Sequence, residues 1–181
     1  MLKPEQRNRL LQIARSSIAE VLDGRRPELR SDEFDEVLRR PSGAFVSLHK
    51  HRRELRGCIG SIQPVHPLYQ AVSTSAINAA FRDPRFLPLQ KSELTVVHIE
   101  ISVMSPIVPV SAEDEIEVGR DGLIISRGRY AGLLLPQVAT EYGWDRHTFL
   151  NQTCIKAGLP PDSWRLPDCR IEKFSAEVFG E

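Results

Sequence analysis

The sequence predicts an α+β fold in which an antiparallel sheet is flanked by helices, with a smaller sub-lobe. Apolar residues recur at three- and four-residue steps over residues 4–22 and again over 67–81, as they do in amphipathic helices. Short segments of alternating hydrophobicity, bounded by Gly and Pro, predict strands. Because strands and helices do not alternate regularly, an antiparallel sheet is favoured over a parallel, doubly wound one.

The elements predicted for the first half of the chain begin with a long helix. They are, in order, a helix over 4–22 that stops near Gly24, a short helix capped by Ser31 or Asp32, two hairpin strands over 43–48 and 54–60, and a helix over 67–81. Asp83-Pro84 ends the last of these, since a residue that precedes proline resists helical geometry.

The second half of the chain is richer in strands. Its predicted elements are a strand over 94–104, a short strand or turn over 116–118, strands over 123–125 and 131–135, a helix that opens at Pro136, a helix from Asp145 to Ala157, and a closing strand over 171–179. With 181 residues, the chain is expected to form a single domain, a larger lobe with the smaller sub-lobe.

Composition narrows the classes of function. A formal net charge of +0 argues against a general nucleic-acid binder, which carries a basic excess. Three widely spaced cysteines, Cys58, Cys154 and Cys169, predict neither a disulfide framework nor a zinc site, and no metal or cofactor is expected. No segment has the length of a membrane span or the core of a signal peptide, so the expected location is the cytoplasm.

The candidate site centres on residues 55–60, Leu-Arg-Gly-Cys-Ile-Gly. On an extended strand, Arg56 and Cys58 share a face that is expected to point outward. A neighbouring cation lowers the pKa of a thiol, and His66 is a candidate base, so the three residues are candidate catalytic groups. The alternative is that Cys58 simply packs, because free cysteine is among the most buried residue types.

Five further residues are candidate ligand contacts. Gly57 and Gly60 leave room for another backbone or a ligand to approach the strand. Asn78 lies on the polar side of the second long helix, and Asp83 and Arg85 follow its end. Arg85 suits a small anionic ligand, a carboxylate or a phosphate. Alternatively, Asp83 and Arg85 pair with each other and fix the turn.

Several segments together resemble the AMMECR domain family. They are residues 43–46, the hexapeptide 55–60, and residues 83–86, 100–103, 119–123, 134–139, 144–145 with 149–150, and 156–159. The resemblance covers residues 5–180, with the hexapeptide as the signature. One departure is His51-Arg52-Arg53, where many members have a glycine-containing turn.

The resemblance implies a compact α+β domain with an antiparallel sheet. It also implies the A component of a three-protein set, the AmmeMemoRadiSam system, in which a Memo-like protein and a radical-SAM enzyme are the partners. No reaction is established for the family. Two hypotheses follow: a binding or accessory module that acts through the face of Arg56 and Cys58, or an enzyme that uses Cys58 as a thiolate nucleophile or substrate contact in a cleft with Arg85 and His66.

Overall fold

A computed structural model describes residues 1–51 and 54–181, and Arg52 and Arg53, at the predicted hairpin turn, lie outside the described residues. The chain divides into two compact units. The first comprises Met1–Met104 with Glu177–Glu181, and the second comprises Ser105–Ala176. The mixture of helices with antiparallel strands confirms the predicted α+β class. The organisation as one domain stays a prediction.

The first unit contains three α-helices, α1 (Pro4–Leu22), α2 (Glu36–Arg39) and α3 (Leu68–Phe81). Both long helices have nearly the predicted bounds, because each has one continuous apolar stripe. Asp35 caps α2 by accepting a hydrogen bond from the Leu38 amide, so the predicted caps, Ser31 and Asp32, are wrong and instead lie in a 3-10 turn that precedes the helix.

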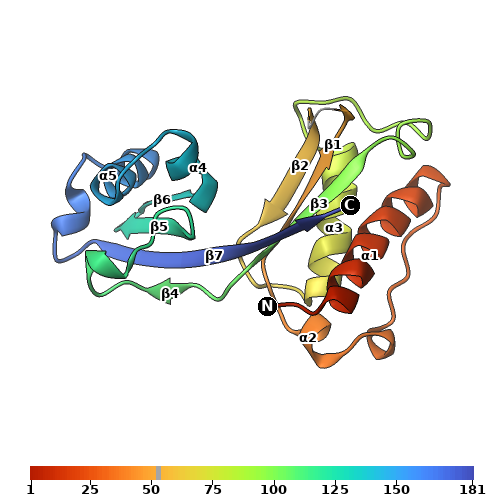
Figure 1. The fold of residues 1–181 in the computed structure, drawn as a ribbon, viewed down its shortest axis with the longest axis horizontal. Helices are drawn as coiled ribbons and strands as arrows, with labels where there is room; N and C mark the ends of the chain where they lie inside the picture. The colour runs from red at the N-terminus through yellow and green to blue at the C-terminus, as the bar shows by residue number, and fades with distance from the viewer. Residues whose placement is uncertain (52–53) are drawn as a thin grey trace. The chain divides into compact units, whose positions relative to one another are not determined.

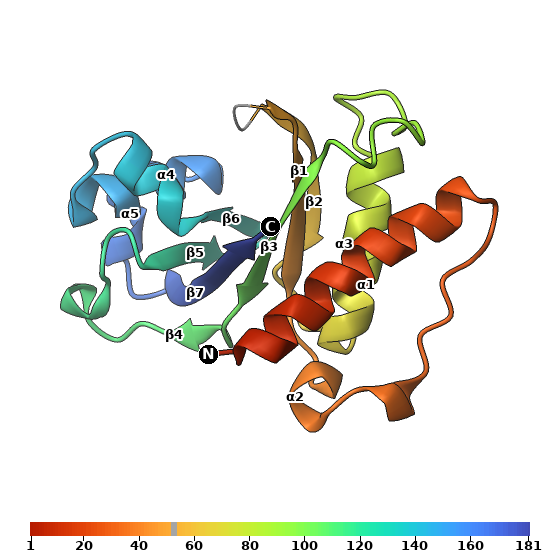
Figure 2. The same ribbon diagram turned by 45° about the vertical axis from the view of Figure 1, so that its right-hand side comes forward.

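The last residues of the chain extend the sheet of the first unit beside Ile99, and three other described strands form the rest of it, in the order β2-β1-β3. They are β1 (Ala44–His49), β2 (Leu55–Ser61) and β3 (His98–Met104), and both pairs are antiparallel. Helix α3 packs on β1 and β2, and α1 packs on α3 and β3, so both helices cover the same side of the strands (Figure 1, Figure 2). The core between them includes Leu10, Ile18, Val46, Leu48, Val72 and Ile101.

Strand β3 begins later than the sequence predicts. The amides of Val96 and Val97 both donate to the carbonyl of Glu93, which makes residues 93–97 a turn. The predicted alternation from residue 94 therefore belongs to a turn at first and to a strand only from His98. This turn holds Glu93 beside the first residues of β2, where its carboxylate contacts Arg56 of the candidate site.

The second unit contains two α-helices and four strands. They are β4 (Val108–Pro109), β5 (Asp121–Arg127), β6 (Tyr130–Leu134), α4 (Pro136–Glu141), α5 (Arg146–Lys156) and β7 (Arg170–Gly180), whose last residues belong to the first unit. β7 pairs with β4 and β5, and β5 also pairs with β6, all antiparallel. Asp145 caps α5 by accepting from the Thr148 amide, as predicted.

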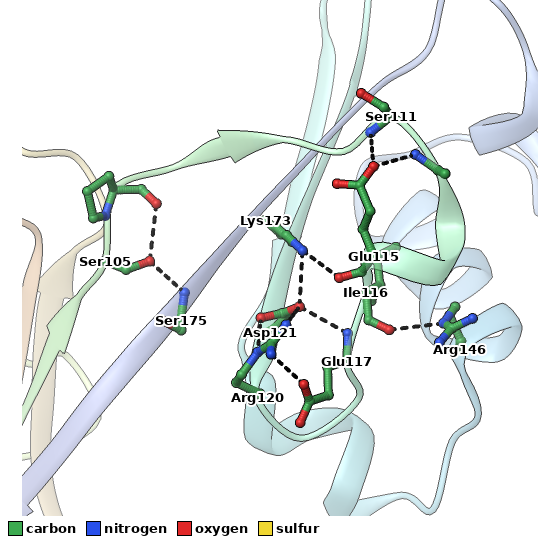
Figure 3. A network of polar contacts seen from close by, with 12 residues as sticks. Ser105, Ser111, Glu115, Ile116, Glu117, Arg120, Asp121, Arg146, Lys173 and Ser175 are labelled. Carbon is green, nitrogen blue, oxygen red and sulfur yellow. Dashed lines mark hydrogen bonds and ion pairs between the residues drawn. The ribbon is translucent and has the colours of Figure 1, made fainter. Parts of the chain in front are cut away.

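A polar network fixes the loop that precedes β5 (Figure 3). The buried carboxylate of Asp121 accepts hydrogen bonds from the Glu117 amide at 3.0 Å and from Arg120 at 2.8 and 2.9 Å, and Nζ of Lys173 lies 3.7 Å away. Burial opposes ionisation of Asp121, but these hydrogen bonds hold its pKa below the usual value. The strand or turn predicted over 116–118 is only partly correct, because Ile116 and Glu117 belong to neither and the turn covers residues 118–120, closed by the Arg120 amide on the carbonyl of Glu117.

Candidate functional site

Strand β2 carries the signature hexapeptide and lies at the edge of the sheet of the first unit, beside α3 (Figure 1). Cys58 pairs with Ser47, and Gly57 pairs with Leu48. A Cβ atom added at Gly57 would lie 2.1 Å from the carbonyl oxygen of Ala79 in α3. The room that the sequence predicts at Gly57 is therefore taken by the backbone of α3, and Cys58 lies on the other face of the strand.

The second glycine of the signature is also explained by a close backbone. A Cβ atom added at Gly60 would lie 2.4 Å from the carbonyl oxygen of Ala44 in β1. Any side chain at Gly60 would therefore push the two hairpin strands apart. Both glycines of the signature thus have a packing reason, independent of any ligand.

The structure differs from the sequence prediction at Arg56. The register shifts next to Leu48: Gly57 pairs with Leu48 and Leu55 pairs with His49, so Arg56 has no partner in β1. A bulge of this kind inserts one residue and breaks the strict alternation of side chains. Arg56 is only 7% exposed, and its predicted outward position is therefore wrong.

The guanidinium of Arg56 is engaged by the turn that follows α3. Its Nε and Nη2 each donate to the carboxylate of Glu93 at 2.9 Å, and Nη2 also donates to the carbonyl of Leu87 at 3.0 Å. Glu93 accepts as well from Nζ of Lys50 at 3.0 Å. The hydrogen bonds from Arg56, helped by those from the Gln90 amide and from Lys50, lower the pKa of Glu93 to about 2. Arg56 is therefore the buried half of an ion pair.

Asp83 fastens the loop after α3 to the edge of β2. Its side chain is 1% exposed, and its carboxylate accepts from the backbone amide of Cys58 at 2.9 Å. The same carboxylate takes Nε and Nη2 of Arg85 at 2.9 and 2.7 Å, in a bidentate pair. These bonds, those of Arg85 first, hold the pKa of Asp83 far below its usual range. The carboxylate satisfies an edge amide that no strand pairs.

Arg85 is the cation that lies next to Cys58. Its Nη2 is 3.4 Å from the carbonyl oxygen of Cys58, and its side chain is 55% exposed. Asp83, and to a smaller extent Cys58, raise the pKa of Arg85. Both roles considered for Arg85, fixing the turn and holding an anionic ligand, remain open. The pair with Asp83 fixes the turn through Nε and Nη2, and Nη1 makes no hydrogen bond among the described residues.

The thiol of Cys58 is half-buried and accepts a hydrogen bond from Oγ of Ser47 at 3.2 Å. His66 makes no hydrogen bond to it in the part of the chain that the structure describes. His66, Gly60 and Asn78 line a different cavity, of about 250 Å³, and Cys58 is not among its lining residues. The structure therefore separates the predicted site into two groups, one around Cys58 and one around His66, and the roles of these residues stay predictions.

Three residues of the site were missed in the sequence. Ser47 could have been found, since it is the polar residue that faces Cys58 once the two hairpin strands are paired. Glu93 lies 37 residues from Arg56, and Lys50 reaches the same carboxylate from the end of β1. No local pattern indicates either of these contacts.

Residues 1–51 and 54–181 contain neither a cluster of metal-ligating side chains nor a membrane-spanning helix. No group of three His, Cys, Asp or Glu side chains is close enough to hold a metal ion. No helix in these ranges combines the length and the apolar character that crossing a bilayer requires.

Comparison with known proteins places the chain in a family. The model of the AMMECR1 family matches residues 11–179. A Methanothermobacter thermautotrophicus protein is 47% identical over 95% of this chain and 92% of its own length, and one from Thermococcus gammatolerans is 45% identical over 99% and 92%. The crystal structure of an uncharacterised Pyrococcus horikoshii protein matches with a TM-score of 0.84 and 42% identity, over 99% of this chain and 93% of that one. The chain therefore belongs to the AMMECR1 family.

Proposed function

We propose that this chain is a binding module that acts in the cytoplasm with a Memo-like protein and a radical-SAM enzyme. The surface that binds them is formed by Cys58 and Arg85 at the edge of β2. The observation that supports the proposal is that one buried carboxylate, that of Asp83, holds both residues in place. Asp83 holds the backbone of Cys58 and the side chain of Arg85, and leaves the guanidinium half-exposed.

Binding is favoured over nucleophilic catalysis because, among the described residues, no candidate base hydrogen-bonds the thiol of Cys58. Both nearby carboxylates, Asp83 and Glu93, are held ionised by arginines. Among the described residues, the hydroxyl of Ser47 is the side chain that hydrogen-bonds the thiol of Cys58. A nucleophilic cysteine needs a base within hydrogen-bond reach, with a third group that orients the base.

The proposal is tested by measuring association of the full chain with a purified Memo-like protein and with a purified radical-SAM enzyme. We expect Arg85→Gln to weaken association about tenfold, since a charge-assisted hydrogen bond is lost. Arg85→Lys keeps a cation beside Asp83, so this variant should fold like the wild type while it loses the bidentate guanidinium. It therefore distinguishes a loss of partner recognition from a loss of folding. Arg30→Gln removes an exposed arginine that pairs with Asp32 and should change nothing. Association with neither partner, or equal binding by all variants, would refute the proposal.

The enzyme alternative makes a separate prediction about the thiol. Alkylation by iodoacetamide across pH, followed by mass spectrometry to assign the cysteine, gives the apparent pKa of Cys58. A value at or above about 8.5, that of a free cysteine, removes the activated nucleophile. A clearly lower value, together with loss of cellular complementation by Cys58→Ser, would favour the enzyme.

A further inference from the structure

A cavity of about 430 Å³ opens between the end of the β1–β2 hairpin and the loop that follows α3. Its lining combines charged and apolar side chains. The charged ones are Lys50, Glu54, Arg56, Arg85 and Glu93. This cavity is distinct from the one that His66 lines, and Leu55 and Arg56, at the bulge of β2, are among its lining residues.

One buried donor at this cavity has no acceptor. Arg56 uses Nε and Nη2 for Glu93 and Leu87, whereas its Nη1 is buried and has no hydrogen-bond partner in the described part of the chain. The side chain of Arg56 is only 9% exposed. An unsatisfied buried donor is unfavourable, and most strongly so when it belongs to a charged group, so a ligand oxygen that reaches it is favoured.

The charges at the cavity favour an anion. Arg56 and Lys50 are two cations that share the single carboxylate of Glu93. Arg85 is already neutralised by Asp83. Glu54 also borders the cavity, but it is exposed and water screens its charge. Among the ion-paired groups, two cations, the buried Arg56 and the partly exposed Lys50, therefore face one carboxylate, and a single further negative charge compensates the excess.

The remaining lining indicates what the anion is attached to. The ring of Phe86 contacts two guanidinium groups, with the Cζ atoms of Arg56 and Arg85 at 5.8 and 5.5 Å from its centroid. Leu87 is 83% exposed and, with Leu55 and Pro88, provides apolar surface at the mouth of the cavity. Exposed apolar side chains beside a buried cation suit a ligand with one charged end and an apolar body.

We propose that this cavity binds a small monocarboxylate with an apolar body, whose carboxylate accepts hydrogen bonds from Nη1 of Arg56 and Nζ of Lys50. Nζ of Lys50 carries three donors and gives one to Glu93, so it has donors to spare. The site does not depend on the proposed function, since the two donors to the ligand, Arg56 and Lys50, are not part of the surface formed by Cys58 and Arg85, although Arg85 also lines the cavity. The carboxylate belongs either to a free acid or to the C-terminus of a peptide.

The test is a titration of the ¹⁵N-labelled full chain, followed by NMR, up to about 20 mM ligand, above the range of millimolar binding. Hexanoate represents a free acid, and N-acetyl-leucine represents a peptide C-terminus. Hexanamide has the same body without the charge. We expect saturable shifts at Lys50, Arg56 and Leu87 with at least one acid, and none with hexanamide; the acid that binds more tightly identifies the source of the carboxylate.

Variants locate the carboxylate. Lys50→Gln should weaken binding about tenfold, because one charge-assisted hydrogen bond is lost. Lys91→Gln is the matched control, since Lys91 is an exposed lysine that pairs with Asp23 outside the cavity. Arg56→Lys keeps a cation near Glu93 but has no Nη1, and should abolish binding. If that variant does not fold, Lys50→Gln still decides. No saturable shift with either acid, equal binding of hexanamide, or full affinity in Lys50→Gln would overturn the proposal.

Discussion

Replacing Glu93 by Gln tests whether a buried ion pair fixes the bulge of β2. The carboxylate of Glu93 is 21% exposed and accepts from Arg56 and Lys50. Its pKa falls from the usual 4.5 to about 2, and this fall corresponds to about 3 kcal/mol of folding free energy at neutral pH. Glu93→Gln should therefore lower the free energy of unfolding by about 3 kcal/mol, since it also leaves Arg56 buried without its anion.

The pH dependence of this loss has a definite sign. Because the pKa of Glu93 is lower in the folded chain than in the unfolded chain, its contribution is complete above about pH 4.5 and is lost as the pH falls towards 2. The difference between the wild type and Glu93→Gln should therefore shrink to less than half at about pH 3. Urea unfolding followed by circular dichroism, at neutral pH and at about pH 3, measures both differences.

Glu36→Gln is the matched control for this experiment. Glu36 also pairs with an arginine, Arg40, but the two side chains are 76% and 66% exposed. Its removal should change the stability little, because water and salt screen an exposed pair. If Glu93→Gln behaves like Glu36→Gln, or if its effect is the same at both pH values, the ion pair does not stabilise the bulge.

Three further substitutions test other contacts. Asp83→Asn should cost about 1–3 kcal/mol and speed hydrogen exchange of the Cys58 amide; an amide that stays fully protected would contradict the contact. Gly57→Ala places a methyl group 2.1 Å from the carbonyl oxygen of Ala79 and should cost about 1–3 kcal/mol or more in urea unfolding; wild-type stability would mean that β2 and α3 are further apart. Asp121→Asn should lower the melting temperature at neutral pH by removing about 1–3 kcal/mol, with a smaller effect below about pH 3.8, where the carboxyl takes up a proton in the unfolded chain before it does so in the folded chain, whose Asp121 pKa is lower; an equal effect at all pH values would argue against the network.

The sequence predicted the helices better than the strands because helical signals are local. Residues 4–22 and 67–81 contain complete apolar stripes, and α1 and α3 have nearly those bounds. The early start predicted for β3 failed because alternation does not distinguish a turn from a strand. The hydrogen bonds of Val96 and Val97 to Glu93 decide that distinction, and they are set by the packed structure.

The site was predicted less well because it depends on a single inserted residue. Alternation places Arg56 beside Cys58 only if the hairpin is regular, and the register shift at Leu48 removes that condition. The acceptor of the displaced side chain, Glu93, comes from a turn far along the chain. The pairing of Asp83 with Arg85 was predicted as one alternative because a polar pair after a helix end is a local signal, whereas the bond of Asp83 to the Cys58 amide has no local signal.

The composition of the signature can now be divided between packing and function. Gly57 is required by the backbone of α3, and Gly60 by the backbone of β1. The Cys58 amide is satisfied by Asp83, and two of the three nitrogens of the Arg56 side chain by Glu93 and Leu87. Packing does not explain why residue 58 carries a thiol, since a serine hydroxyl could also accept a hydrogen bond from Ser47. Nor does packing explain why Nη1 of Arg56 is buried without a hydrogen-bond partner among the described residues. These two groups are therefore where substitutions that preserve the fold should change what the protein binds.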